Sequence, residues 1–175
     1  MHRSSRQDWV RERSEQHAFL RQAIRLAEEA ERRGNLPIGA VITLDSQIIA
    51  TGMNSIWQPT LELTRHAEME ALRHVPPHLW PRSMEMALFT TLEPCLMCAG
   101  AILLHHVGRL VFGSSDPYGG VASCLDSLPP YFRQEFSLVE WTGPALPAEC
   151  DPLYLRIQEL ERQRGPGPPI RLADA

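Results

Sequence analysis

The chain has 175 residues, of which 43% are hydrophobic, and its formal net charge is −4. This length and hydrophobic content predict one compact domain whose core needs no disulfide bridges. The charge balance gives no support to a large nucleic-acid footprint, although a local basic groove stays compatible with it.

The N-terminal segment is polar and lacks the apolar run of a secretory signal, and no stretch is long enough to span a bilayer. We therefore expect a cytoplasmic protein with no membrane partner. In that reducing environment a Cys-x-x-Cys pair indicates metal or redox chemistry rather than a structural disulfide.

Hydrophobic periodicity predicts helices and strands that alternate along the chain. The predicted helices span residues 9–33, 65–74, 94–105 and 152–164. The predicted strands span residues 38–44, 47–53, 86–91, 109–113 and 137–141. Such alternation indicates a layered α/β domain, and its opening hairpin makes the sheet mixed in strand direction.

The ends of these elements carry their own signals. Thr64 and Asp151 are candidate caps for the helices that follow them, and Pro94 suits a first helical position because its missing N–H costs nothing there. Residues 1–8 are expected to form a flexible arm. The Gly-Pro-Gly-Pro-Pro run predicts that residues 165–175 form a loose tail, which leaves one domain over residues 9–164.

Two short motifs carry the chemistry: His-Ala-Glu at residues 66–68 and Pro-Cys-Leu-Met-Cys at residues 94–98. Cys95 and Cys98 are three residues apart, so both sulfur atoms lie on one face at a helix start, where the helix N-terminus favours thiolate. With His66 they supply three zinc ligands, and a catalytic zinc keeps its fourth position for water. We therefore expect one zinc ion per chain, bound by these three residues.

Glu68 is expected to be a catalytic base rather than a ligand. Residues i and i+2 of a helix point to nearly opposite sides, so His66 and Glu68 converge only if the metal lies beyond the helix end. We infer that two helices direct their N-termini at one zinc. Glu68 would take a proton from the zinc-bound water, leaving hydroxide to attack an amino-bearing ring carbon, and would then protonate the ring and the departing amine. This predicts zinc-dependent hydrolytic deamination with release of ammonia.

These motifs resemble the signature of the cytidine deaminase superfamily of zinc-dependent deaminases. More narrowly, the chain is similar to the branch that contains bacterial tRNA adenosine deaminases and small nucleoside or guanine deaminases. The resemblance covers roughly residues 17–125. The segments that carry it are residues 36–41, Asn54, residues 66–68, residues 91–101 and residues 109–113.

The resemblance implies a three-layer α/β/α fold, in which a central mixed five-stranded sheet has helices on both faces, and it implies a homodimer. It also implies that Asn54 hydrogen-bonds the base. Pro37, Ile38, Ala67 and Pro94 are the further substrate-binding residues that it suggests.

The substrate remains open between alternatives. In the tRNA-editing branch Asp-Pro-Thr-Ala usually precedes His-Ala-Glu, whereas this chain has Leu-Glu-Leu-Thr-Arg at residues 61–65. The loop after Gly113 lacks the lysine often found there, and the last helix mixes arginines with glutamates. Because RNA binding depends on phosphate neutralisation, we favour a free nucleobase or nucleoside as substrate, with adenosine in tRNA as the alternative.

Two further interpretations compete with catalysis. A catalytically silent, deaminase-like binding module would hold structural zinc, with Cys124 or Cys150 as the fourth ligand, and a redox Cys-x-x-Cys pair would need no metal. Glu68 argues against the silent module, because a structural zinc site has no use for a carboxylate at that position. The redox interpretation is disfavoured because the pair lacks an aromatic-Cys-Gly-Pro-Cys context after a first strand. Arg65, just before the first motif, is either a solvated charge or a group that acts on the substrate, and Tyr118 lies in a loop expected to border the pocket.

Overall fold

The computed structural model describes residues 6–165, with side chains from residue 12 onward. Five strands form one sheet in the order β2-β1-β3-β4-β5. They are β1 (Gly39–Leu44), β2 (Gln47–Met53), β3 (Ala87–Leu92), β4 (Arg109–Ser114) and β5 (Glu140–Thr142). β1 runs antiparallel to β2 and β3, whereas β3, β4 and β5 are parallel. The predicted mixed five-stranded sheet is confirmed.

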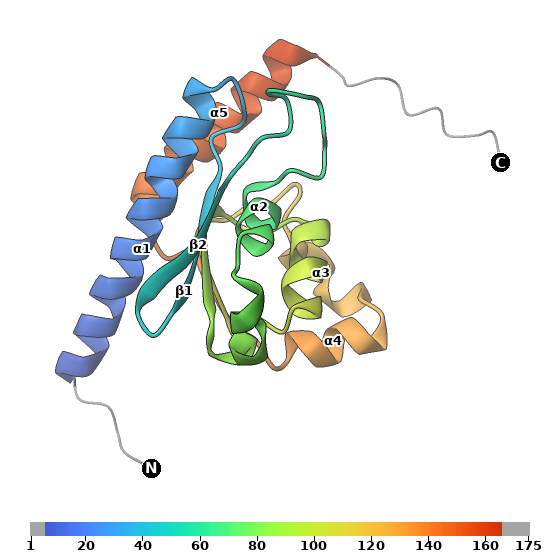
Figure 1. Cartoon of the computed structure of the whole chain (residues 1–175). Coiled ribbons are helices and arrows are strands. Elements are labelled where there is room, and N and C mark those ends of the chain that lie inside the picture. The colour runs from blue at the N-terminus through green and yellow to red at the C-terminus, as the bar shows by residue number, and fades with distance from the viewer. Residues whose placement is uncertain (1–5, 166–175) are drawn as a thin grey trace.

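Helices cover both faces of this sheet (Figure 1). They are α1 (Arg6–Arg32), α2 (Ala67–Arg73), α3 (Leu96–Leu104), α4 (Pro130–Phe136) and α5 (Pro147–Arg164). α1 and α5 pack on one face, and α2 and α3, with α4 beside α3, lie on the other. Two short 3₁₀ helices, Pro77–Glu85 and Val121–Ser127, complete the described chain.

The central strands are apolar because both of their faces are covered. Every residue of β1 is buried, and successive side chains enter opposite layers. Val41 joins Leu20 and Phe89 in the cluster beneath α1, whereas Ile42 joins Leu88 in the larger cluster beneath α2 and α3. The sheet is therefore a rigid platform between two apolar layers.

Gly52 in β2 brings α2 into direct contact with the sheet. A Cβ atom at this position would collide with the backbone oxygen of Ala67 and the backbone nitrogen of Ala71. A residue without a side chain is thus required for the helix to approach so closely. Since α2 begins beside His66, this contact also sets the height of that histidine above the sheet.

Three predicted helix starts are wrong, each for a tertiary reason. α3 begins at Leu96, so Pro94 is not its first residue; the Pro94 carbonyl instead accepts a hydrogen bond from Val121 N. α2 begins at Ala67 and is capped by His66, not by Thr64. α5 begins at Pro147, so Asp151 lies inside it and accepts a hydrogen bond from another element.

The predicted outer segments fall partly outside the described residues. Residues 6–8 of the expected arm belong to α1, which begins at Arg6. Residues 1–5 of that arm and residues 166–175 of the expected tail lie outside the described residues. Within the described chain, no helix has both the length and the apolar character needed to cross a membrane.

Candidate metal centre and active site

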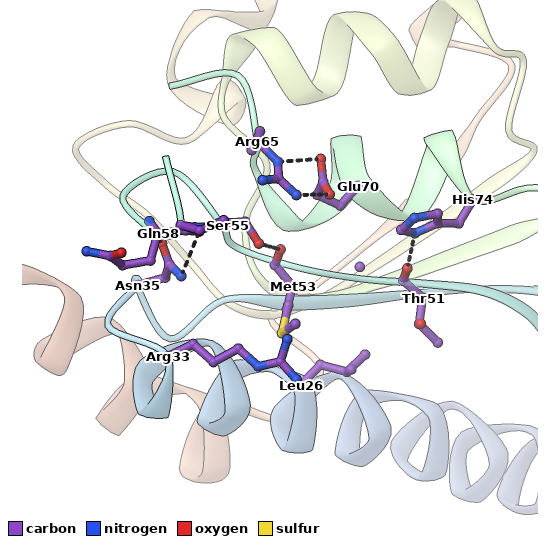
Figure 2. A pocket seen from close by; sticks show the side chains of 12 residues that line it. Leu26, Arg33, Asn35, Thr51, Met53, Ser55, Gln58, Arg65, Glu70 and His74 are labelled. Carbon is purple, nitrogen blue, oxygen red and sulfur yellow. Dashed lines mark hydrogen bonds and ion pairs between the residues drawn. The ribbon is translucent and has the colours of Figure 1, made fainter. Parts of the chain in front are cut away.

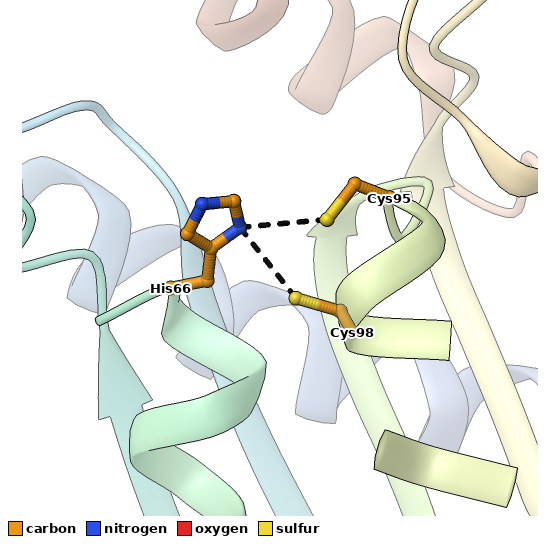
Figure 3. A group of neighbouring side chains, drawn as sticks. All are labelled: His66, Cys95 and Cys98. Carbon is orange, nitrogen blue, oxygen red and sulfur yellow. Dashed lines mark hydrogen bonds between the residues drawn. The ribbon is translucent and has the colours of Figure 1, made fainter. Parts of the chain in front are cut away.

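Two helix starts meet at the site. His66 is the cap residue of α2 and Cys95 is the cap residue of α3, and both have extended backbone conformations. Figure 3 shows the His66 ring and the sulfur atoms of Cys95 and Cys98 pointing toward one another from these two helices. The convergence inferred from the spacing within each motif is therefore present in the fold.

The three side chains have the separations that a zinc ion requires. His66 Nδ1 lies 3.6 Å from Cys95 Sγ and 3.5 Å from Cys98 Sγ. A tetrahedral zinc with ordinary Zn–N and Zn–S bonds places nitrogen and sulfur about 3.5 Å apart. Among the residues that the structure describes, these three form the only group of potential ligands, with all donor atoms within 4.8 Å of one another.

The two other cysteines lie outside this group. Cys124 is partly buried and donates its thiol to the Val121 carbonyl. Cys150 is buried against Gly113, and burial raises the pKa of its thiol to about 12. Since neither is placed as a fourth ligand, the donor set matches an open site rather than a closed structural one.

The two thiols of the site are coupled. A hydrogen bond from Cys98 stabilises the Cys95 thiolate and, with His66, lowers the pKa of Cys95 to about 4. Donation of that bond raises the pKa of Cys98, and the bond with Cys95 raises the pKa of His66. A divalent cation between them favours both thiolates and the neutral imidazole, because metal binding displaces their protons.

Glu68 lies in the first turn of α2, and only 4% of its surface is exposed. Its Oε1 accepts a 3.0 Å hydrogen bond from the Thr90 hydroxyl, and its Oε2 lies 3.4 Å from Cys98 Sγ. Burial raises the pKa of this carboxyl group. A buried carboxyl with a raised pKa beside a metal site has the properties of a group that carries protons.

Asn54 has an amide with an unused donor. It follows β2, is fully buried, and its Oδ1 accepts a hydrogen bond from Ile56 N. Its backbone N–H donates to the Ile38 carbonyl, which ties together two of the residues expected to line the pocket. Its Nδ2 is buried and has no hydrogen-bond partner among residues 6–165. A donor left in this state costs about 1–3 kcal/mol, so Nδ2 is suited to an acceptor on a ligand.

The remaining residues expected at the pocket are all buried. Ala67 begins α2 directly after His66, and Pro94 directly precedes Cys95. Pro37 is buried just before β1. β1 and β3 bring this region to the site, because Ala40 pairs with Thr90, the residue that donates to Glu68.

Sequence reasoning missed the roles of Thr90 and Glu93. Glu93 is buried and uses both carboxylate oxygens to accept backbone hydrogen bonds, from Asp116 N at 3.1 Å and from Ala122 N at 2.9 Å. The signal was available: a threonine inside an apolar strand, and a carboxylate just before the metal-binding motif, each need a buried partner.

Arg65 turns away from the metal-binding atoms. Its guanidinium donates two hydrogen bonds to the buried Glu70 carboxylate, at 3.3 Å and 2.9 Å, and the hydrogen bond lowers the pKa of Glu70. This pair lines a cavity of about 690 Å³ beside the edge strand β2, where His74 Nδ1 also contacts the Thr51 carbonyl (Figure 2). The cavity includes none of the three metal-binding residues, and both charge-bearing ends of this pair are engaged with each other.

A larger open cleft of about 1260 Å³ lies between the loop that leads to His66, residues 115–120 and the end of α5. Its lining combines five apolar or aromatic residues with two arginines and one glutamate. The lining residues are Ile56, Trp57, Leu61, Leu63, Tyr118, Gln158, Glu161, Arg162, Arg164 and Gly165. Arg164 stacks on the Trp57 ring at 4.3 Å, which joins α5 to the loop before α2.

Comparison with known proteins agrees with this geometry. Residues 13–114 match the family model described as the cytidine and deoxycytidylate deaminase zinc-binding region. The chain is 40% identical to the tRNA-specific adenosine deaminase of Haemophilus influenzae over 135 residues, which are 75% of this chain and 76% of that protein. It is 40% identical to the enzyme of the same name from Bacillus subtilis over 111 residues, which are 63% of this chain and 68% of that protein.

Solved structures of deaminases also align with this chain. A structure from work on A-to-I editing by tRNA:A34 deaminases aligns with a TM-score of 0.65 and 29% identity, over 78% of this chain and 99% of that one. The guanine deaminase of Bacillus subtilis aligns with a TM-score of 0.50 and 35% identity, over 57% of this chain and 64% of that one. The region matched by the family model contains all three metal-binding residues and Glu68.

Proposed function

The chain belongs to the cytidine and deoxycytidylate deaminase family, and from that premise we propose that it hydrolyses the amino group of an adenosine in tRNA, leaving inosine and ammonia. The observation that carries the reaction type is the buried Glu68 carboxylate beside the ligand set of His66, Cys95 and Cys98. This proposal differs from the expectation drawn from the sequence, which favoured a free nucleobase or nucleoside over adenosine in tRNA. Relatives 40% identical to this chain are named tRNA-specific adenosine deaminases, and they support the alternative.

The chemistry divides between the metal and the protein. His66, Cys95 and Cys98 would hold zinc, which would supply Lewis acidity toward water. Glu68 would take the proton from that water on Oε2, which faces Cys98, while Oε1 keeps the hydrogen bond from the Thr90 hydroxyl. The carboxyl group then delivers protons to the ring nitrogen beside the reacting carbon and to the departing amine. One C–O bond forms, one C–N bond breaks, and one water is consumed for each ammonia released.

Asn54 would orient the base. Its Nδ2 is a buried donor without a partner in the described part of the chain, and a ring nitrogen or carbonyl oxygen of a base is an acceptor that would satisfy it. Ala67, Ile38, Pro37 and Pro94 would form the walls through their backbone and apolar atoms. A pocket of this kind reads a flipped base by hydrogen bonds to its edge and by apolar contact with its faces.

The cleft supports a substrate larger than one nucleoside. Its volume of about 1260 Å³ and its lining by Trp57, Tyr118 and Leu63 suit unpaired nucleotides, whose bases stack on aromatic and apolar side chains. Arg162 and Arg164 would meet phosphate groups there. A tRNA substrate and a pair of zinc-binding thiolates both fit the reducing cytoplasm expected from the sequence.

We also propose a homodimer, formed through α3. Leu96, Gly100 and Leu104 are spaced four residues apart on one face of this helix, and the two leucines are 57% and 55% exposed. A second copy of the chain would cover this apolar stripe. Leu104→Glu should then lower the mass measured by light scattering to that of one chain, and an unchanged mass would refute this interface.

A second candidate, deamination of a free purine, is favoured by the 35% identity to a guanine deaminase. Ammonia release from the zinc-loaded protein would separate the two when measured with a tRNA anticodon stem-loop and with free bases and nucleosides. We expect turnover of the stem-loop, with inosine detected in the product. Turnover of a free base alone would replace the proposed substrate with the second candidate.

The reaction type is tested by Glu68→Gln, with Glu28→Gln as the matched control because Glu28 is an exposed carboxylate on α1. Loss of a general base of this kind should lower kcat by about 10²-fold or more, while zinc content stays near one per chain. Full activity of Glu68→Gln would disprove its assigned role, and loss of zinc would show that Glu68 is itself a ligand.

A further inference from the structure

The loop of residues 115–120, here called the Asp116 loop, carries Tyr118 to the cleft and Gly120 to the metal centre. Tyr118 is 97% exposed, so no packing of its own ring fixes its position. Gly120 pairs with Cys95 through a β-bridge, and Val121 N donates to the Pro94 carbonyl. The placement of Tyr118 therefore depends on how the backbone of this loop is held.

Glu93 holds the loop from the side of the metal centre. Its carboxylate accepts hydrogen bonds from Asp116 N and Ala122 N, which lie on either side of the Tyr118 tip. A Cβ atom on Gly120 would lie 2.5 Å from the Glu93 carboxyl carbon, so the loop passes directly over this buried group. These contacts fix the two ends of the loop. A second set of hydrogen bonds fixes its tip.

α5 holds the tip from the other side. Asp116 Oδ1 accepts hydrogen bonds from Tyr118 N and Gly119 N, both at 3.0 Å, and a third from the Tyr154 hydroxyl at 3.1 Å. The first two bonds close the turn that presents Tyr118, and the third attaches that turn to α5. Ser114, at the end of β4, makes a parallel attachment when its hydroxyl donates to Asp151 at 2.6 Å.

We propose that Tyr154 is a positioning residue for substrate binding, which acts through Asp116 to hold Tyr118 at the edge of the cleft. Tyr154 and Asp116 both lie outside residues 13–114, the part of the chain that matches the family model. In this proposal the C-terminal helix α5 fixes the position of Tyr118, whereas α2 and α3 fix the positions of Glu68 and the metal-binding residues. The inference rests on the proposed deamination, but it holds for any substrate that extends into the cleft.

Tyr154→Phe tests the proposal because it removes one hydroxyl and keeps the ring in place. Tyr131→Phe is the matched control, since Tyr131 is exposed on α4 and its hydroxyl makes no hydrogen bond among the described residues. Loss of one net hydrogen bond corresponds to about a two- to tenfold change in an equilibrium constant. For the zinc-loaded Tyr154→Phe enzyme we expect KM to rise by that factor while kcat and zinc content stay unchanged.

A double-mutant cycle separates positioning from general stability. Tyr118→Ala should raise KM, and adding Tyr154→Phe to it should raise KM no further, because the side chain that Tyr154 positions is then absent. Additive effects on KM, or a fall in kcat with KM unchanged, would overturn the proposal.

Amide hydrogen exchange supplies a readout that needs no activity. Tyr154→Phe should speed exchange at Tyr118 and Gly119, while exchange in α5 beyond the substituted residue stays as in the parent protein. Unchanged exchange at these two amides would refute the attachment itself. If the parent protein turned over none of the tested substrates, the proposed function would fail, and exchange would still decide the attachment.

Discussion

Gly52→Ala should displace α2 and weaken the metal centre, although residue 52 touches none of the ligands. The added Cβ atom would collide with Ala67 O and Ala71 N and would lie 3.0 Å from Ala71 Cα. All three are backbone atoms, so no side-chain rotation can relieve the collision. The helix must retreat by roughly 1 Å before these atoms reach ordinary van der Waals separation.

The expected losses of stability and zinc affinity depend on how far α2 and its cap residue His66 move. Overpacking against a rigid neighbour costs about 1–3 kcal/mol, and backbone contacts place this site near the upper end. His66 is the cap of α2, and metal sites tolerate displacements of only about 0.5 Å. We therefore expect a loss of about 2–3 kcal/mol in the free energy of unfolding of the metal-free protein, and zinc affinity lower by about tenfold or more.

Denaturant unfolding of the metal-free protein and competition with a zinc chelator measure the two quantities separately. Thr51→Ala is the control, because Thr51 is the exposed neighbour of Gly52 on the same strand. If Gly52→Ala matched Thr51→Ala within about 0.5 kcal/mol and bound zinc equally well, the close approach of α2 would not depend on Gly52.

Three further substitutions test other parts of the site. Cys95→Ala should abolish stoichiometric zinc binding and the stabilisation that zinc adds, because metal binding free energy is also folding free energy; full zinc occupancy by elemental analysis would exclude Cys95 as a ligand. Asn54→Asp replaces the unpartnered donor with an acceptor, so kcat/KM should fall by about tenfold to a hundredfold with zinc content unchanged; an unchanged kcat/KM would remove Asn54 from the substrate contacts. Glu70→Gln should cost about 1–2 kcal/mol at pH 7, because it weakens the bond from Arg65. The pKa of Glu70 is lowered from 4.5 in the folded protein, so the extra stability of the parent protein is complete above pH 4.5 and is lost as pH falls through the lowered pKa. A stability difference between parent and variant that stayed constant down to pH 2 would contradict the ion pair as its source.

The metal centre could be predicted from sequence because ligand chemistry restricts geometry. Cys95 and Cys98 can share a metal only near a helix start, and His66 with Glu68 can converge only beyond a helix end. Together these two conditions require the first turns of α2 and α3 to lie close together, as they do in the fold. Thr90 and Glu93 were not assigned, because a single sequence does not say which buried polar groups will be neighbours.

Helix boundaries were less predictable because tertiary bonds decide them. Local propensity places Pro94 inside a helix, yet its carbonyl bonds to Val121 N and Cys95 pairs with Gly120, so the helix begins two residues later, at Leu96. Cys95, the residue that forms this bridge, also carries one of the two sulfur atoms that face His66. The error in the predicted start of α3 therefore falls on a residue of the site.

The departures from the tRNA-editing pattern have a second interpretation in this fold. Arg65 was weighed as a cation beside the reacting groups, but its guanidinium bonds to Glu70 and supports α2 from the far side. Leu61 and Leu63 lack charge, yet they are exposed in the cleft, where bases rather than phosphates would meet them. A count of basic residues tests phosphate neutralisation alone. A cleft that binds unpaired bases by stacking should therefore show a weaker dependence of substrate affinity on salt than a basic groove would.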